Sequence, residues 1–164
     1  MRRRIVAGNW KLHGDRAFAA SLLDALAAVP APDGVERVIL PPLPYLGELI
    51  EDYAARGLAF GSQDVSANEK GAYTGEVSAS MLLDVGARYG LVGHSERRQY
   101  HNESSELVAH KFMAAKHAGL VPILCIGETL HEHEAGQTER TIEAQLAPIF
   151  SHGGAQALEG AVVA

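Results

Sequence analysis

The sequence has only one cysteine, Cys125, in 164 residues, so it cannot form a disulfide within the chain. A chain without internal disulfides fits a reducing compartment, and we expect a cytoplasmic protein. The sequence also lacks a long apolar run. Its first apolar segment, Ile5–Gly8, is followed at once by Asn9 and Lys11, which is too early for a signal sequence or a membrane span. We therefore predict no association with a membrane.

Basic residues are also few, and they are scattered along the chain. The net charge is −6, and the only Lys/Arg clusters are Arg2–Arg4 and the pair Arg97–Arg98. An extended basic face typical of nucleic-acid-binding proteins is missing, so we predict no nucleic-acid partner. Hydrophobic residues make up 47% of the chain and charged residues 21%, which is the composition of a globular domain.

Short apolar runs recur along the chain and predict β-strands. Their spacing of roughly 20 to 40 residues leaves room for a helical crossover between successive strands. The runs do not alternate polar and apolar residues, which is typical of strands buried on both faces in a parallel sheet. The runs are Ile5–Ala7, Val38–Leu40, Leu58–Phe60, Leu91–Val92, Pro122–Leu124 and Ala161–Val163.

Helical stretches lie between these runs. Apolar residues at helical spacing form stripes, the first of them after an expected N-cap at Asp15. The stripes are Phe18, Leu22, Leu26 and Val29; Leu46, Leu49, Ile50 and Tyr53; and Ile142, Leu146 and Ile149, while the segment 106–117 places Leu107, Lys111 and Ala114 on adjoining turns. The alternation of strands and helices predicts an α/β domain, either doubly wound or a closed barrel. We favour the barrel, because polar residues follow several strands and no G-x-G-x-x-G fingerprint follows the first.

The number of predicted strands indicates what fraction of a complete barrel the chain contains. A complete β/α barrel has eight strands and typically about 250 residues, whereas this chain offers six strand candidates. The last run ends close to Ala164, with no helix after it. We therefore predict an α/β fold that is a parallel β/α barrel truncated after about six of eight strands. Residues 1–164 would form one partial barrel domain, from the first strand to the start of the sixth.

Polar side chains follow the expected strands, at the ends where β/α barrels build their active sites. In a closed barrel these strand ends converge on one rim, so their joint placement points to a single site. Asn9 and Lys11 follow the first strand, Gln63–Asp64 the third, His94–Arg98 the fourth and Cys125–Glu128 the fifth.

Each of these residues also has an ordinary structural explanation. Lys11 could be a solvated surface lysine, and His94 could be a histidine with purely structural hydrogen bonds. Glu96–Arg98 could be an ion-pair cluster, and we assign that role to Arg97. Cys125 lies in an apolar run beside Ile126, which fits a small buried residue better than a reactive thiolate.

Two further polar segments need an interpretation. His131–Glu134 resembles a metal cluster, but histidines two positions apart diverge on a helix, so we predict a solvated polar loop and no metal site there. Asn68–Glu76 is a connection punctuated by glycine, and an ordinary surface loop is the simple explanation. Its length and its aromatic residue suggest that it meets a partner.

Four motifs, in order and at matching spacing over the whole chain, resemble the triosephosphate isomerase family. His13 and Ser105 stand where that family often has Asn and Asp, which affects local contacts only. The motifs are Gly8-Asn9-Trp10-Lys11, similar to the family's first strand; Gly71–Glu76, similar to its dimer loop; Gly93–Arg98, similar to its catalytic histidine motif; and Pro122–Glu128, similar to its fifth strand.

This resemblance implies an isomerase of glycolysis and gluconeogenesis. The reaction would interconvert dihydroxyacetone phosphate and glyceraldehyde 3-phosphate through an enediolate, with no metal and no organic cofactor. We expect His94, Lys11 and Glu96 to be catalytic: His94 would move protons between the substrate oxygens, and Glu96 would hold Lys11 in place. Asn9 and Lys11 would bind the substrate. His94 would stay neutral beside the positive end of the following helix, an effect for which this family is the standard example.

The resemblance also implies a homodimer in the full-length protein. In the family, the loop that corresponds to Tyr73, Thr74, Gly75 and Glu76 inserts beside the active site of the other subunit. Thr74 would then matter for catalysis without contacting the substrate.

The family continues beyond its sixth strand with segments that this sequence does not contain. These are a Tyr-Glu-Pro motif with the glutamate base, a Trp-Ala-Ile-Gly-Thr-Gly lid and two more strands with glycine-rich phosphate loops. Two alternatives therefore remain. The chain as it stands could be a non-catalytic fragment, or the protein could be another phosphate-handling barrel isomerase, since a fold alone does not fix a function.

Overall fold

Six parallel strands form one sheet in the order β1-β2-β3-β4-β5-β6. The structure is a computed structural model that describes residues 4–164, so Arg2 and Arg3 of the basic cluster lie outside the described residues. The strands are β1 (Arg4–Asn9), β2 (Val35–Leu40), β3 (Ala59–Ser62), β4 (Tyr89–Val92), β5 (Val121–Leu124) and β6 (Val162–Val163). All six predicted strands are confirmed. Since each strand pairs with the next one in the sequence, the sheet has no reversal of strand order and is not doubly wound.

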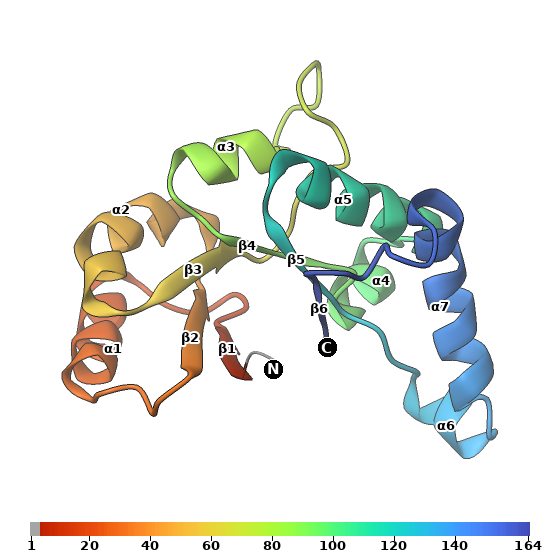
Figure 1. The fold of residues 1–164 in the computed structure, drawn as a ribbon, viewed down its shortest axis with the longest axis horizontal. Helices are drawn as coiled ribbons and strands as arrows, with labels where there is room; N and C mark the ends of the chain where they lie inside the picture. The colour runs from red at the N-terminus through yellow and green to blue at the C-terminus, as the bar shows by residue number, and fades with distance from the viewer. Residues whose placement is uncertain (1–3) are drawn as a thin grey trace.

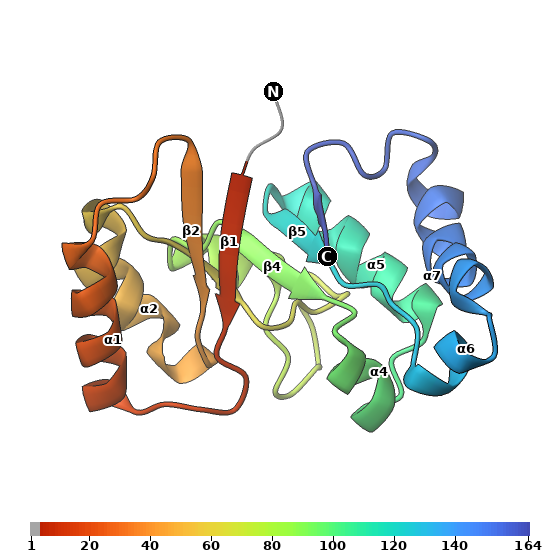
Figure 2. The ribbon, with the colours of Figure 1, turned by 90° about the horizontal axis from the view of Figure 1, so that it is seen from below.

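Helices cover the convex side of this curved sheet, so that the molecule has the shape of an open half-barrel (Figures 1 and 2). The helices are α1 (Arg16–Ala28), α2 (Leu43–Tyr53), a 3₁₀ turn η1 (Ala54–Arg56), α3 (Ala79–Asp84), α4 (Ser95–Tyr100), α5 (Ser105–Ala118), α6 (Leu130–Glu134) and α7 (Thr138–Gly153). The predicted partial β/α barrel is confirmed. None of the helices in residues 4–164 is both long and apolar enough to cross a membrane.

Side-chain caps explain where several helices begin. The Asp15 carboxylate accepts a hydrogen bond from the backbone N–H of Phe18 at 2.8 Å, which confirms the predicted cap of α1. The Ser104 hydroxyl does the same for Leu107 at the start of α5, and α5 ends at Gly119, whose left-handed φ of 103° favours glycine. These local signals fix the start of α1 and both ends of α5.

The predicted apolar face of α1 is wrong in part, whereas that of α2 is confirmed. On α1 the fully buried residues are Ala19 and Leu23, while Phe18 is 46% exposed. Phe18 packs edge-on against Trp10, with ring centroids 5.4 Å apart, instead of facing the sheet. Val29 lies beyond the helix end in an extended conformation and is also exposed. On α2 the whole predicted stripe, Leu46, Leu49, Ile50 and Tyr53, is buried.

Burial of the strands depends on their place in the sheet. All four residues of β4 are buried, as predicted for a strand covered on both faces, but most of β1 is exposed. The expectation of a strand buried on both faces is therefore wrong for β1, because among the described residues it pairs with β2 alone and lies at an edge of the sheet.

The strand register aligns the carboxyl ends of neighbouring strands. Asn9 at the end of β1 is opposite Leu40 at the end of β2, and Val92 at the end of β4 is opposite Leu124 at the end of β5. Residues that follow these strands therefore emerge along one edge of the sheet, and the candidate site is built there.

Candidate active site

The turn after β1 is held in an unusual backbone conformation. Lys11 has a φ of 53°, which is uncommon for a residue other than glycine. The Asn9 side-chain oxygen accepts from the Lys11 N–H at 2.9 Å, and the Gln63 amide donates to the Lys11 carbonyl at 3.0 Å and to the Leu40 carbonyl at 2.9 Å. Gln63 therefore ties the turn after β1 to the ends of β2 and β3. This restrained turn gives the Lys11 side chain a fixed starting point.

Glu96 holds the other end of the Lys11 side chain. The Lys11 Nζ lies 2.6 Å from Glu96 Oε1, and the hydrogen bond from this ammonium group keeps the pKa of Glu96 below its usual value. Both side chains are more than 40% exposed, and at such exposure an ion pair adds little to stability. The contact therefore positions Lys11, which is the role expected for Glu96.

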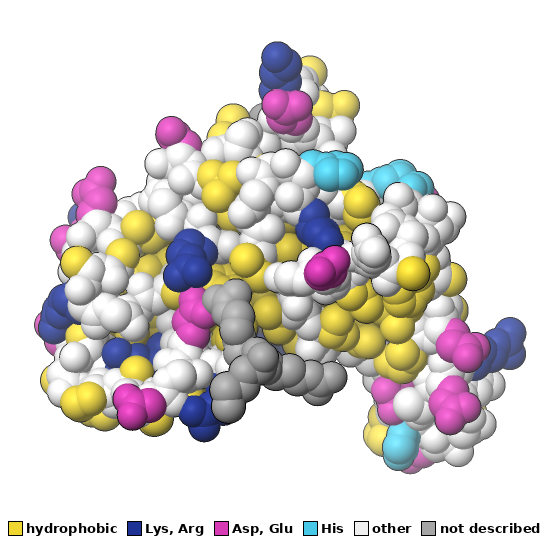
Figure 3. Space-filling view, viewed as in Figure 1, with side chains coloured by type: hydrophobic (Ala, Val, Ile, Leu, Met, Phe, Trp, Pro, Cys, Tyr) yellow, Lys and Arg dark blue, Asp and Glu magenta, His cyan; other side chains and the backbone are white. Residues whose placement is uncertain are grey.

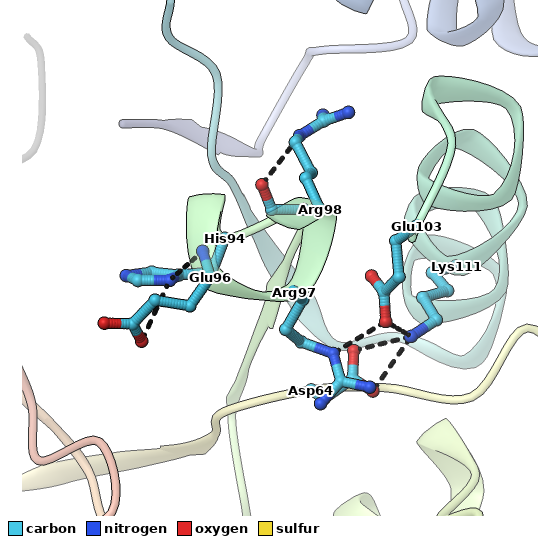
Figure 4. A network of polar contacts seen from close by, with 8 residues as sticks. Asp64, His94, Glu96, Arg97, Arg98, Glu103 and Lys111 are labelled. Carbon is cyan, nitrogen blue, oxygen red and sulfur yellow. Dashed lines mark hydrogen bonds and ion pairs between the residues drawn. The ribbon is translucent and has the colours of Figure 1, made fainter. Parts of the chain in front are cut away.

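His94 is the N-cap of α4, and its ring accepts a hydrogen bond from the backbone of the same helix. The Glu96 N–H donates to Nδ1 at 3.2 Å, so Nδ1 carries its lone pair and the proton of the neutral ring lies on Nε2. The Glu96 Oε2 lies 3.5 Å from the same Nδ1, which would suit a protonated ring. The backbone contact decides the matter, because an N–H group cannot donate to a nitrogen that already carries a proton. Figure 4 shows the ring extending away from α4 with its second nitrogen at the far end.

These residues line one cleft with a volume of about 490 Å³. Asn9, Lys11, His94 and Glu96 all contribute to its wall, together with Gln63. The prediction that His94 and Lys11 share a rim with Glu96 is therefore confirmed.

Arg97 also lines the cleft, but its guanidinium belongs to an ion-pair network, as expected from the sequence (Figure 4). Its guanidinium lies 3.0 Å from Asp64 Oδ2 and 2.6 Å from Glu103 Oε1. The buried Lys111 Nζ of α5 contacts the same two carboxylates, at 2.9 and 2.6 Å. Burial raises the pKa of Asp64, whereas at Glu103 the bonds from Lys111 and Arg97 outweigh burial and lower the pKa. The network joins α4 to the loop after β3 and to α5, and it thereby fixes the helix that His94 caps.

We expect Lys111→Met to destabilise the protein strongly, because it removes the buried cation of the network and leaves Asp64 and Glu103 with only the more exposed Arg97. Removing one partner of a buried ion pair costs about 3–5 kcal/mol in the free energy of unfolding. Urea unfolding of the protein produced from its full coding sequence measures this loss. The control is Arg140→Met at an exposed position of α7, where we expect a change within about 0.5 kcal/mol. A loss below about 1 kcal/mol for Lys111→Met would contradict a structural role for the network.

Cys125 and the polar segment His131–Glu134, for which the sequence predicted no catalytic or metal-binding role, lie outside the cleft. Cys125 is partly buried, and this burial raises the pKa of its thiol, which fits its assignment as a structural residue and not a nucleophile. His131 and His133 do not lie in a loop as predicted: they are on the short helix α6, which a capping box between Thr129 and Glu132 begins. The sequence contains the Thr-x-x-Glu pattern of a capping box, which predicts a helix start here, but the polar composition of the segment favoured a loop.

The loop between β3 and α3 projects from the body of the molecule at the top of Figure 1. Its base is closed by a hydrogen bond from the Ser66 N–H to the Val77 carbonyl at 2.9 Å. Gly71 and Gly75 have φ values of 137° and 92°, which permit the tight turns around Tyr73. The tip residues Tyr73, Thr74, Gly75 and Glu76 are all exposed. The loop is therefore ordered by its own contacts and presents its tip to the outside.

The cleft holds hydrogen-bond donors and two cations, Lys11 and Arg97, but no free carboxylate among the described residues. Its one carboxylate is Glu96, which Lys11 occupies. Such a site can polarise a substrate oxygen and stabilise negative charge on it. Within residues 4–164, the one group of three side chains able to hold a metal ion lies elsewhere, on α5 and α7.

Comparison with known proteins agrees with this geometry. The family model described as "Triosephosphate isomerase" matches residues 4–164. Proteins named triosephosphate isomerase from Stenotrophomonas maltophilia (strain K279a), Xanthomonas euvesicatoria pv. vesicatoria (strain 85-10) and Xanthomonas oryzae pv. oryzae (strain PXO99A) are 70%, 69% and 68% identical to this chain. Each comparison covers all 164 residues of this chain and 65% of the relative. The chain therefore spans about 65% of the length of these relatives, and it belongs to the triosephosphate isomerase family.

Proposed function

We propose that the protein is a triosephosphate isomerase that interconverts dihydroxyacetone phosphate and glyceraldehyde 3-phosphate through an enediolate, without a cofactor. Family membership supports this function. The observation that carries it is the hydrogen bond from the Glu96 N–H to His94 Nδ1, which places the ring proton on Nε2. The Nε2–H group is then a donor in the cleft that also contains Lys11 and Asn9.

The described residues supply the polarising half of this reaction. His94 Nε2–H donates to a substrate oxygen as negative charge develops on it and passes protons between the two oxygens, while the Lys11 ammonium group stabilises the same charge. Asn9 is a further polar contact for the substrate. The base that removes the proton from carbon comes from outside these residues, in the position that the family gives to the glutamate after its sixth strand. Glu96 acts on Lys11 and not on the substrate.

An assay of the protein produced from its full coding sequence tests the proposal. We expect isomerisation of triose phosphates to exceed that of other sugar phosphates, measured as kcat/KM under the same conditions. A preference for another sugar phosphate would favour a different barrel isomerase and overturn the assignment. The absence of activity on every sugar phosphate would favour a non-catalytic protein.

We further propose that the protein acts as a homodimer through the loop that carries Tyr73, Thr74, Gly75 and Glu76. The loop is longer than a simple β/α connection needs, and its tip is exposed. An aromatic residue at the tip of an ordered loop is typical of interface contacts. The lone cysteine, which cannot form a disulfide within the chain, supports a cytoplasmic location.

Thr74→Arg is expected to shift this dimer toward monomers. The substitution adds an unpaired charge to a contact that the proposed dimer would bury, which costs about 3–5 kcal/mol and raises the dissociation constant by about 100-fold or more. Analytical ultracentrifugation of the full-length product measures the shift. Ala31→Arg adds the same charge to an exposed segment between α1 and β2, and we expect it to leave the dimer intact. An unchanged dimer in Thr74→Arg would argue against this loop as the interface.

A further inference from the structure

Helices α5 and α7 bring three metal-ligand side chains together on the outer surface, away from the cleft. Glu106 and His110 lie one turn apart on α5, and His152 is near the end of α7. One ligand atom from each residue lies within 4.8 Å of the other two. Figure 3 shows histidine side chains on the surface in the region of α5.

The contacts within this cluster centre on one carboxylate oxygen. His110 Nε2 lies 3.5 Å from Glu106 Oε1, and His152 Nε2 contacts the same oxygen atom. The two imidazole rings face each other at a tilt of 56°, with centroids 4.8 Å apart. Both histidine nitrogens thus approach the Glu106 carboxylate, and the three ligand atoms lie within 4.8 Å of one another.

The packing of α5 against α7 fixes where these ligands lie. Ile149 of α7 is fully buried in the core. At Gly153 the helices are so close that a Cβ atom would lie 3.2 Å from the Met113 sulfur of α5. The Lys116 ammonium of α5 donates to the Ala157 carbonyl at 2.6 Å, just beyond α7. Because the backbones are held in this way, the three ligands need no rearrangement of the helices to meet.

The ligand set selects a class of metal. Two imidazole nitrogens and one carboxylate oxygen suit a divalent transition metal such as Zn²⁺, and they leave a fourth position open for water. Bonds of about 2.0–2.1 Å place the ligand atoms of a tetrahedral site about 3.3 Å apart. The 3.5 Å between His110 Nε2 and Glu106 Oε1 is close to that spacing. Rotation of the exposed side chains would bring the ligand atoms from their present positions to those of a tetrahedral site.

We propose that Glu106, His110 and His152 form a binding site for a zinc-type divalent metal that links α5 to α7. None of the three residues lines the cleft, so the site is independent of the proposed isomerase activity. Since two of the ligands come from one helix and the third from its neighbour, the bound metal would act as a cross-link between the two.

Calorimetric titration of the untagged full-length product with ZnCl₂ tests the proposal, with Co²⁺ absorption as a second probe. We expect one metal ion per chain. His110→Ala, His152→Ala and Glu106→Gln should each weaken binding by at least about tenfold. His117→Ala removes an exposed histidine of α5 outside the cluster and should bind as tightly as the unmodified protein.

Thermal unfolding separates a cross-link from loose surface binding. A metal that binds only the folded state raises the melting temperature. We expect Zn²⁺ to raise it in the unmodified protein and in His117→Ala, and the rise to disappear in His110→Ala and His152→Ala. No binding at millimolar Zn²⁺, or equal binding and equal stabilisation in all variants, would overturn the proposal.

Discussion

His94→Gln in the full-length product is expected to lower kcat on triose phosphates by about 10²- to 10⁴-fold, with KM changed only a few-fold. Glutamine keeps a hydrogen-bond donor in the cleft but cannot pass a proton between two oxygens. The loss therefore falls on the transition state, where negative charge is greatest, and not on substrate binding.

Steady-state kinetics separates the two effects, and His117→Gln is the matched control. His117 is an exposed histidine near the end of α5, so its replacement should leave kcat unchanged. An unchanged kcat with a raised KM in His94→Gln would make His94 a substrate anchor and remove it from the proton transfers.

The 164-residue polypeptide produced alone is expected to show no isomerisation above background. The residues that line the cleft can polarise a carbonyl group, but none of the carboxylates in or near the cleft is available to take a proton from carbon. Glu96 is occupied by Lys11. Glu128 accepts a hydrogen bond from the Thr138 hydroxyl at 3.1 Å and contacts His133. Its own backbone and these two side chains keep the pKa of Glu128 below its usual value, so it is a weak base.

A coupled assay compares this polypeptide with the full-length product at equal concentration, after circular dichroism has shown that both are folded. The open sheet predicts that the polypeptide associates, because β1 and β6 each have a single neighbour among the described residues and most of β1 is exposed. Turnover near that of the full-length product would contradict the claim that the 164 residues lack the base that removes the proton from carbon.

The strands and the shared rim could be predicted from the sequence because both depend on local patterns. A run such as Val38–Leu40 reads as a buried strand wherever it lies, and parallel strands place the residues after them along one edge. The strand pattern therefore predicts that Asn9, Lys11 and His94 lie along the same edge of the sheet, without knowledge of any contact between them. Arg97 was likewise assigned to an ion pair, which the structure confirms.

Other features depend on contacts that no local pattern encodes. On α1, Ala19 and Leu23 face the core while Phe18 packs on Trp10, an arrangement that the helical stripe does not predict. Gln63 spans two loops through its amide, and nothing in the sequence marks it as different from other polar residues at strand ends. His152 lies 46 positions from Glu106, and only the packing of α5 on α7 reveals the pair.

The position of the ring proton on His94 links the fold to the proposed reaction, and nitrogen-15 NMR of the labelled full-length product measures it directly. At pH 7.5 we expect a proton bonded to Nε2 and a lone-pair signal from Nδ1, since the Glu96 N–H occupies Nδ1. His94→Gln identifies the signals by their loss. A proton found on Nδ1 would contradict the hydrogen bond on which the site is built, and with it the role of His94 as a donor through Nε2.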